Sequence, residues 1–202
     1  MSTYLFIMKK YVFIILLIPR LLLGQTDELN QRINAFKNDL SSNYKVKTLN
    51  IGGERLGAIE YEDCLYRTKF KLEKLEKQRD NLNRNVKFDI FMTIVEFSDT
   101  DDLNWAMKRW LKDFIDGSQI RPGRNSRSVS NANPSIIVIE GNSISILNQP
   151  CMQFEAIEYR NWRSKMLTYF GSPSSVIIEI GGCGGPLNWT KNAPDPRDRT
   201  WK

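Results

Sequence analysis

The chain contains three cysteines and no histidine, and this combination restricts the chemistry that it can perform. Histidine is the most common general base, the most common metal ligand and the usual partner of a serine or cysteine nucleophile. Cys64, Cys151 and Cys183 are widely separated and form no CxxC pattern of the kind that binds zinc. We therefore expect no bound metal, no cofactor and no conventional catalytic residue.

Cys183 lies in the glycine-rich segment IGGCGGPLNW, residues 180–189, directly after a predicted strand. Cys151 follows an earlier predicted strand, and in the expected fold both strands end at the same edge of the sheet. Because glycines allow the chain to curl there, we predict that the two cysteines form a disulfide, which an export compartment permits. Closing a loop of about 30 residues would contribute about 3 kcal/mol in the chain-entropy model.

Other roles for the cysteines stay open. A nucleophilic Cys183 would need a nearby cation, helix N-terminus or base to stabilise its thiolate, and no histidine is present to act as that base. A different pairing, or no pairing, is the second alternative. Cys64 falls in a predicted helix, where we expect a small buried hydrophobic side chain.

Carboxylates are the remaining candidates for acid and base chemistry. Glu96, Glu140 and Glu179 fall in or beside predicted strands, and a cleft that brings two of them together could support a histidine-free hydrolase or transferase. Three aspartates follow the first of these strands. Their position at the start of a predicted helix explains them without a metal, because acidic side chains favour the positive end of the helix dipole. They are Asp99, Asp101 and Asp102.

Three arginines at three-residue spacing lie in the polar segment 119–134, which predicts a long surface loop. Guanidinium groups bind phosphate, sulfate or carboxylate through paired hydrogen bonds. Arg121, Arg124 and Arg127 are therefore candidates for binding an anion or an acidic partner, with a solvated loop as the simpler alternative. Trp105 and Trp162 are further candidates for partner contacts, although tryptophan is more often found in the core.

Residues 1–24 have the layout of a signal peptide, with two lysines, a short apolar run and a glycine at the exit. The alternative is an uncleaved anchor, which would be the chain's contact with a membrane. Cleavage removes three basic residues and lowers the formal net charge from +6 to +3. So small an excess does not indicate a nucleic-acid-binding protein. We expect a secreted or periplasmic protein.

Residues 86–186 predict an α+β ferredoxin-like module. Val86–Phe97 has apolar residues at every second position, as in a strand, and is followed by a helical pattern. Gly141-Asn142 separates two β-branched runs and predicts a hairpin. A second helix and a final strand complete the order strand, helix, strand, strand, helix, strand, which is that of the split βαβ sheet.

The segment before this module, residues 25–85, predicts a helical extension. One short amphipathic helix over residues 27–42 has an apolar line formed by Leu29, Ile33, Phe36 and Leu40. A short strand over residues 44–51 and a long helix from Ala58 to Leu82 are expected to follow. Residues 187–202 predict a flexible tail.

The sequence thus favours an exported, non-catalytic protein that acts through contacts with another protein or surface, in the cell envelope or outside the cell. The competing hypothesis is a hydrolase or transferase that uses carboxylates or the Cys183 thiol.

Overall fold

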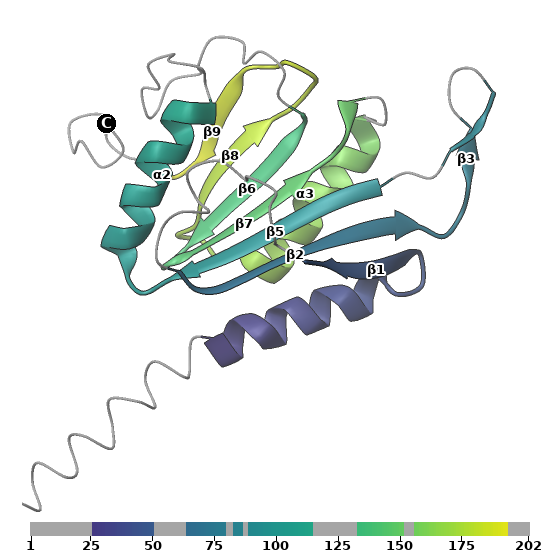
Figure 1. The fold of residues 1–202 in the computed structure, drawn as a ribbon. Helices are drawn as coiled ribbons and strands as arrows, with labels where there is room; N and C mark the ends of the chain where they lie inside the picture. The colour runs from purple at the N-terminus through teal and green to yellow at the C-terminus, as the bar shows by residue number, and fades with distance from the viewer. Residues whose placement is uncertain are drawn as a thin grey trace, which may run out of the picture.

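A computed structural model describes the chain over residues 26–50, 64–79, 83–86, 89–114, 133–151 and 156–193. The predicted signal peptide, the arginines at 121, 124 and 127, and the end of the predicted tail lie outside these residues. Three helices are described: the N-terminal helix over residues 26–40, α2 (Thr100–Phe114) and α3 (Ala156–Phe170). They surround a single large sheet (Figure 1).

This sheet has seven antiparallel strands, and the chain does not visit them in spatial order. From one edge to the other they are β1 (Tyr44–Leu49), β2 (Cys64–Lys74), β5 (Asp89–Phe97), β7 (Ser143–Asn148), β6 (Ser135–Glu140), β8 (Val176–Ile180) and β9 (Leu187–Lys191). A separate two-stranded ribbon pairs β3 (Gln78–Arg79) with β4 (Asn85–Val86). The α+β class is confirmed, and so are the hairpin turn at Gly141 and the order of elements from β5 to β8.

The ferredoxin-like strand order is wrong. That arrangement would place β8 beside β5, but β8 pairs with β6 instead, with Ile180 opposite Ser135. The edge of β5 that β8 would take is instead paired with β2 along nearly its whole length, from Glu73 opposite Asp89 to Cys64 opposite Phe97. Because β2 already holds this edge, β8 extends the sheet on the other side. β9 then pairs with β8, so the prediction of a flexible tail from residue 187 is wrong over Leu187–Lys191.

β2 is the reason that the prediction of a long helix from Ala58 to Leu82 is also wrong over residues 64–74. Phe70 and Leu72 are fully buried, whereas the alternate residues Lys71 and Glu73 are only partly buried. This alternation is typical of a strand with one face on a core. Leu65 and Leu75, two leucines near the ends of β2, are instead exposed.

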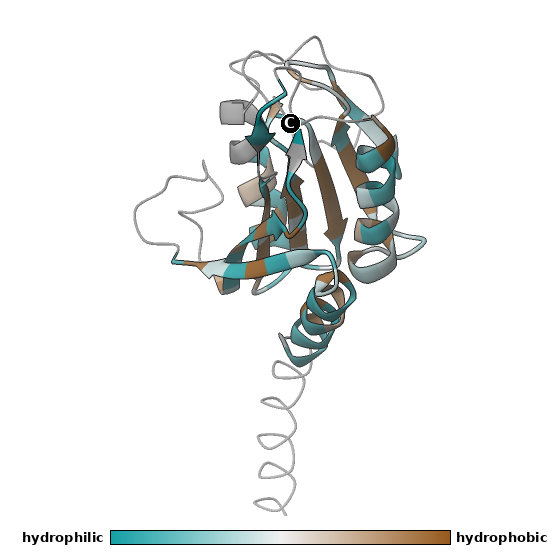
Figure 2. Cartoon of the chain, turned by 90° about the vertical axis from the view of Figure 1, so that its right-hand side faces the viewer, coloured by the Kyte–Doolittle hydropathy of each residue, from teal (hydrophilic) through white to brown (hydrophobic). Residues whose placement is uncertain are grey.

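The two crossovers place α2 and α3 on opposite faces of the sheet. The connections β5–α2–β6 and β7–α3–β8 each skip one strand in the same direction, but β5 and β7 are antiparallel. Right-handed crossovers from oppositely directed strands must leave the sheet on opposite sides. The strands are therefore covered on both faces, and in Figure 2 the central strands are mostly brown while much of the outer helical surface is teal.

Each face has its own core. On the α2 side, Leu103, Ala106 and Met107 pack against the odd-numbered residues of β5 near its end. On the α3 side, Tyr159, Trp162, Met166 and Phe170 pack together with the N-terminal helix. That helix presents the predicted apolar line to this core, with Leu29, Ile33, Phe36 and Leu40 all buried, so the predicted amphipathic helix is confirmed.

Phe36 is the centre of the α3-side core. Its ring is fully buried and lies 5.2 Å from Phe170, 5.5 Å from Tyr169, 6.3 Å from Phe70 and 6.4 Å from Trp162, measured between ring centroids. Aromatic contacts at these separations are favourable in edge-to-face and tilted geometries. One side chain thus joins the N-terminal helix to β2 and to α3.

Replacing Phe36 with alanine is expected to lower the free energy of unfolding by about 3–5 kcal/mol, because it removes buried area and leaves a cavity among the four rings. The matched control is Asn34→Ala, an exposed position on the same helix, which should change stability by less than about 0.5 kcal/mol. Urea denaturation followed by fluorescence measures both values. Equal, small effects would mean that the helix does not pack on the sheet.

Candidate functional site

A groove of about 460 Å³ opens on the α3 side of the sheet, where three parts of the chain meet. One wall is the first half of α3, and the opposite wall is the turn from the N-terminal helix into β1 together with the end of β2. The lining residues are Ser42, Asn43, Tyr44, Lys74, Leu75, Glu76, Ile157, Glu158, Asn161, Trp162 and Lys165. The volume falls within the range of about 300–1,000 Å³ that is usual for ligand sites.

Aromatic side chains form the bottom of the groove. The rings of Tyr44 and Trp162 meet edge to face with their centroids 5.2 Å apart, and Trp162 is buried. The Tyr44 hydroxyl donates a hydrogen bond of 2.9 Å to Glu158. Burial, together with the nearby Glu158 carboxylate, raises the pKa of Tyr44 well above its usual value. The hydroxyl therefore stays protonated and donates its hydrogen bond to Glu158.

The upper edge of the groove carries two large aliphatic side chains that face solvent. Ile157 is 70% exposed and Leu75 is 56% exposed. In the described part of the chain, two other large apolar side chains are comparably exposed, Trp105 at 54% and Leu65 at 50%. Single exposed apolar residues are common and need no explanation, but here two of them border the same concave surface. That combination is typical of a binding site.

The charged side chains around the groove are largely paired with one another. Lys74 lies 3.7 Å from Glu158, and Lys165 forms an ion pair with Asp39 of the N-terminal helix. Paired charges of this kind offer little to a charged ligand. The groove surface is mixed, and its apolar and aromatic part is formed by Tyr44, Leu75, Ile157 and Trp162.

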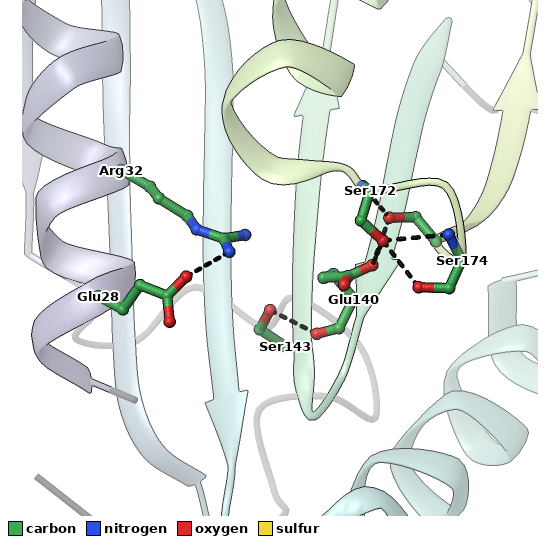
Figure 3. Close-up of polar contacts among 7 residues, drawn as sticks. Glu28, Arg32, Glu140, Ser143, Ser172 and Ser174 are labelled. Atoms are coloured by element: carbon green, nitrogen blue, oxygen red, sulfur yellow. Dashed lines mark hydrogen bonds and ion pairs between the residues drawn. The ribbon is translucent and has the colours of Figure 1, made fainter. Parts of the chain in front are cut away.

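Two of the predicted carboxylates share a second, smaller pocket of about 170 Å³. Glu96 of β5 and Glu140 of β6 both lie opposite Ser143 of β7 in the strand register. The three residues therefore form one row across the sheet on the face covered by the N-terminal helix. Glu28 and Arg32 of that helix, an ion pair at 2.5 Å, complete the pocket (Figure 3).

Both carboxylates are held by hydroxyl groups. Glu96 is buried, and its Oε2 accepts a hydrogen bond of 3.1 Å from Thr26 at the start of the N-terminal helix. Burial raises the pKa of Glu96. Glu140 accepts hydrogen bonds from Ser172, at 2.8 Å, and from Ser175 in the turn before β8 (Figure 3). These contacts tie the helix start and the α3–β8 turn to the sheet.

Glu179, the third candidate, lies elsewhere. It is opposite Ile136 in the register, four residues along β6 from Glu140. Its two carboxylate oxygens each accept a bond of 3.0 Å from Nε of Arg163 on α3. Glu140 and Glu179, which a cleft could have brought together, do not share a pocket here.

The predicted aspartate cluster has a structural role. Asp99 caps α2, because its Oδ1 accepts hydrogen bonds of 2.9 Å from the backbone nitrogens of Asp101 and Asp102. Among the described residues, no group of three or more Asp, Glu, Cys or His side chains is arranged to hold a metal ion.

The structure brings together two of the three cysteines. Cys151 and Cys183 lie close enough for their thiols to interact, although neither is bonded. Cys64 is half-buried in β2 and packs against the α2-side core. The two tryptophans that were candidates for partner contacts lie on opposite faces of the sheet. Trp162 is at the bottom of the groove, and Trp105 is exposed on α2.

Comparison with protein-family models, with curated proteins and with solved structures finds no match to this chain. In the part of the chain that the structure describes, no helix is long and apolar enough to cross a membrane.

The sequence did not reveal the groove, nor that Glu96 and Glu140 lie in one row across the sheet. The signal for this row was present, because both glutamates flank the hairpin strand Ser143–Asn148 at positions that a correct register aligns. The groove had no sequence signal of its own, since its walls come from parts of the chain more than 80 residues apart.

Glu96→Gln is expected to stabilise the protein at pH 7. Burial raises the pKa of Glu96 in the folded protein, so folding favours the protonated carboxyl group. The stability that this group contributes is present below the pKa of the unfolded chain, about 4.3, and is lost as the pH rises above it. Urea denaturation at pH values from 4 to 7 should show that the free energy of unfolding of Glu96→Gln increases relative to that of the wild type as the pH rises.

The control for this experiment is Glu28→Gln on the same helix, where the carboxylate is well exposed. It should show no such gain with pH. A wild type that gains stability relative to Glu96→Gln as the pH rises would show that the folded protein favours the ionised carboxylate.

Proposed function

We propose that this chain is an exported, non-catalytic binding protein whose groove between α3 and the end of β2 receives an apolar side chain of a partner protein. The observation that supports this most strongly is the pair of exposed aliphatic residues, Leu75 and Ile157, beside the packed rings of Tyr44 and Trp162. A partner that covers them removes apolar area from water, at about 25 cal/mol per Å².

The chemistry of the groove favours an aliphatic anchor on a protein segment. Lys74, Glu158 and Lys165 are already in ion pairs, so a charged ligand would gain little from them. The groove is also open and leaves Ile157 70% exposed, whereas small-molecule sites usually bury most of their ligand. A protein segment can fill the groove with one side chain and cover Leu75 and Ile157 with its neighbours.

A hydrolase or transferase is the second candidate, and the shared pocket of Glu96 and Glu140 is the observation that favours it. Two features make it the weaker proposal. The pocket volume of about 170 Å³ is below the usual range for substrates, and both carboxylates already accept hydroxyl hydrogen bonds. Thiol chemistry at Cys151 is also disfavoured, because burial and the neighbouring Cys183 raise the pKa of its thiol to about 11.

The groove is tested with an array of short peptides that differ in one central residue, covering aliphatic, aromatic, acidic and basic types. Wild-type protein should bind the aliphatic members most tightly. The double variant Leu75→Gln with Ile157→Gln should bind them at least tenfold more weakly, because truncation of two buried apolar contacts costs about 1–2 kcal/mol or more.

The matched control is Leu65→Gln with Trp105→Gln, which removes the other two exposed large apolar side chains of the described residues. Both double variants should remain folded, since exposed substitutions have small effects on stability. Peptide binding that is equally weakened in both variants, or that shows no preference for aliphatic residues, would rule out the groove as the binding site.

Export is tested by intact-mass analysis of the protein produced in a bacterial host. We expect cleavage after Gly24, so that the mature chain begins at Gln25 and is recovered from the periplasm or the medium. A chain that keeps its first 24 residues and sediments with membranes would support an anchored protein instead.

A further inference from the structure

Cys151 and Cys183 occupy equivalent places after two strands that run in the same direction. Ser135 at the start of β6 lies opposite Asn148 of β7 on one side and opposite Ile180 of β8 on the other. Each cysteine comes three residues after the end of its strand. Two strand spacings, about 9.6 Å, separate β7 from β8, so the chain must turn inward over the start of β6 for the cysteines to meet.

The glycine-rich segment forms the connection from β8 to β9, and this connection carries Cys183. The backbone nitrogen of Gly185 donates a hydrogen bond of 3.1 Å to the carbonyl oxygen of Gly182, which makes residues 182–185 a β-turn. Gly184 has a φ of +61° at the third position, a conformation that favours glycine. Cys183 is the second residue of the turn and is exposed.

The two thiols are neighbours. Burial raises the pKa of the Cys151 thiol to about 11, with a further contribution from a hydrogen bond to Cys183 and from its charge. Such an interaction requires the sulfur atoms to lie within contact distance. Cys64 is the first residue of β2, opposite Phe97 at the end of β5, whereas the end of β7 lies opposite Phe91 near the start of β5. Cys64 is therefore at the other end of the sheet and is not involved.

We propose that Cys151 and Cys183 form a reversible disulfide that joins the ends of β7 and β8 across the start of β6. The oxidant is a small-molecule disulfide, such as cystine or glutathione disulfide. The Cys183 thiolate attacks one of its sulfurs, forming a mixed disulfide and releasing one thiol. The Cys151 thiol then loses its proton to water, attacks the Cys183 sulfur and releases the second thiol. Because little of Cys151 is ionised near neutral pH, this step is the slower of the two. Two electrons pass to the oxidant, and the two protons end on the released thiols.

The order of attack follows from exposure. Cys183 is solvent-exposed at the tip of the turn, whereas Cys151 is half-buried behind it. Cys183 therefore meets the oxidant first, and Cys151 acts as the resolving thiol. The bond encloses α3 in a covalent loop, because α3 connects β7 to β8.

The test uses the purified full chain, equilibrated with glutathione disulfide or with a reducing agent and then unfolded in the presence of an alkylating reagent. Of the three cysteines, the oxidised chain should take up label at Cys64 alone, and peptide mapping should find Cys151 joined to Cys183. Its melting temperature should exceed that of the reduced chain by about 10 °C. Label at all three cysteines after oxidation, or a bond that includes Cys64, would overturn the proposal.

The matched variants are Cys64→Ser and Cys151→Ser. Cys64→Ser should keep the difference in melting temperature between the oxidised and reduced forms, and Cys151→Ser should lose it. If Cys151→Ser retains the difference, another effect of oxidation explains it and the proposal is wrong.

The contribution of the turn is tested with Gly184→Ala, which places a side chain at positive φ and should slow disulfide formation several-fold. Gly181→Ala is its control, because the added methyl group at that position meets no atom within 4 Å. Equal rates in the two variants would contradict the role assigned to the turn.

Discussion

The pairing of β2 with β5 is the interaction on which the rest of the structure depends. It occupies the edge that the last strand would take in a ferredoxin-like sheet, so β8 joins β6 instead. The second crossover then runs in the same direction as the first, and right-handedness places α3 on the face opposite α2. Without this pairing, both helices would share one face.

The N-terminal helix packs where it does because α3 leaves part of one sheet face uncovered. α3 covers only part of its face, and the N-terminal helix fills the remainder over β1, β2 and β5, with Phe36 contacting rings from β2 and α3. Where the helix ends and the chain turns into β1, the surface between β1 and α3 stays open. The groove is this gap, and the Tyr44–Trp162 contact closes its bottom.

Local patterns in the sequence predicted much of the fold. The apolar line of the N-terminal helix, the alternation in β5 and the Gly141-Asn142 turn each depend on neighbouring residues, so each was readable. β2 was assigned to the predicted long helix because the leucines at 65, 72, 75 and 82 fall near one face of such a helix. Leu65 and Leu75 are in fact exposed, and the alternation from Phe70 to Glu73 was the better signal.

The candidate sites were less predictable because they depend on strand order. The nearness of Cys151 and Cys183 was predicted correctly, but for a wrong reason: β7 and β8 flank β6 rather than β5. Both arrangements leave one strand, and therefore two strand spacings, between the two cysteine-bearing strands, so the same conclusion followed. The alignment of Glu96 with Glu140 and the formation of the groove require the observed register and the observed side for α3. Neither can be inferred from composition or periodicity.

Backbone NOE contacts between strands test the β2–β5 pairing most directly. NMR spectra of the isotopically labelled protein should show cross-strand contacts between Phe70 and Met92 and between Leu72 and Ile90. Contacts from Met92 to β8 residues such as Ile178, in place of those to β2, would contradict the account, because they would restore the ferredoxin-like order and move α3 to the other face.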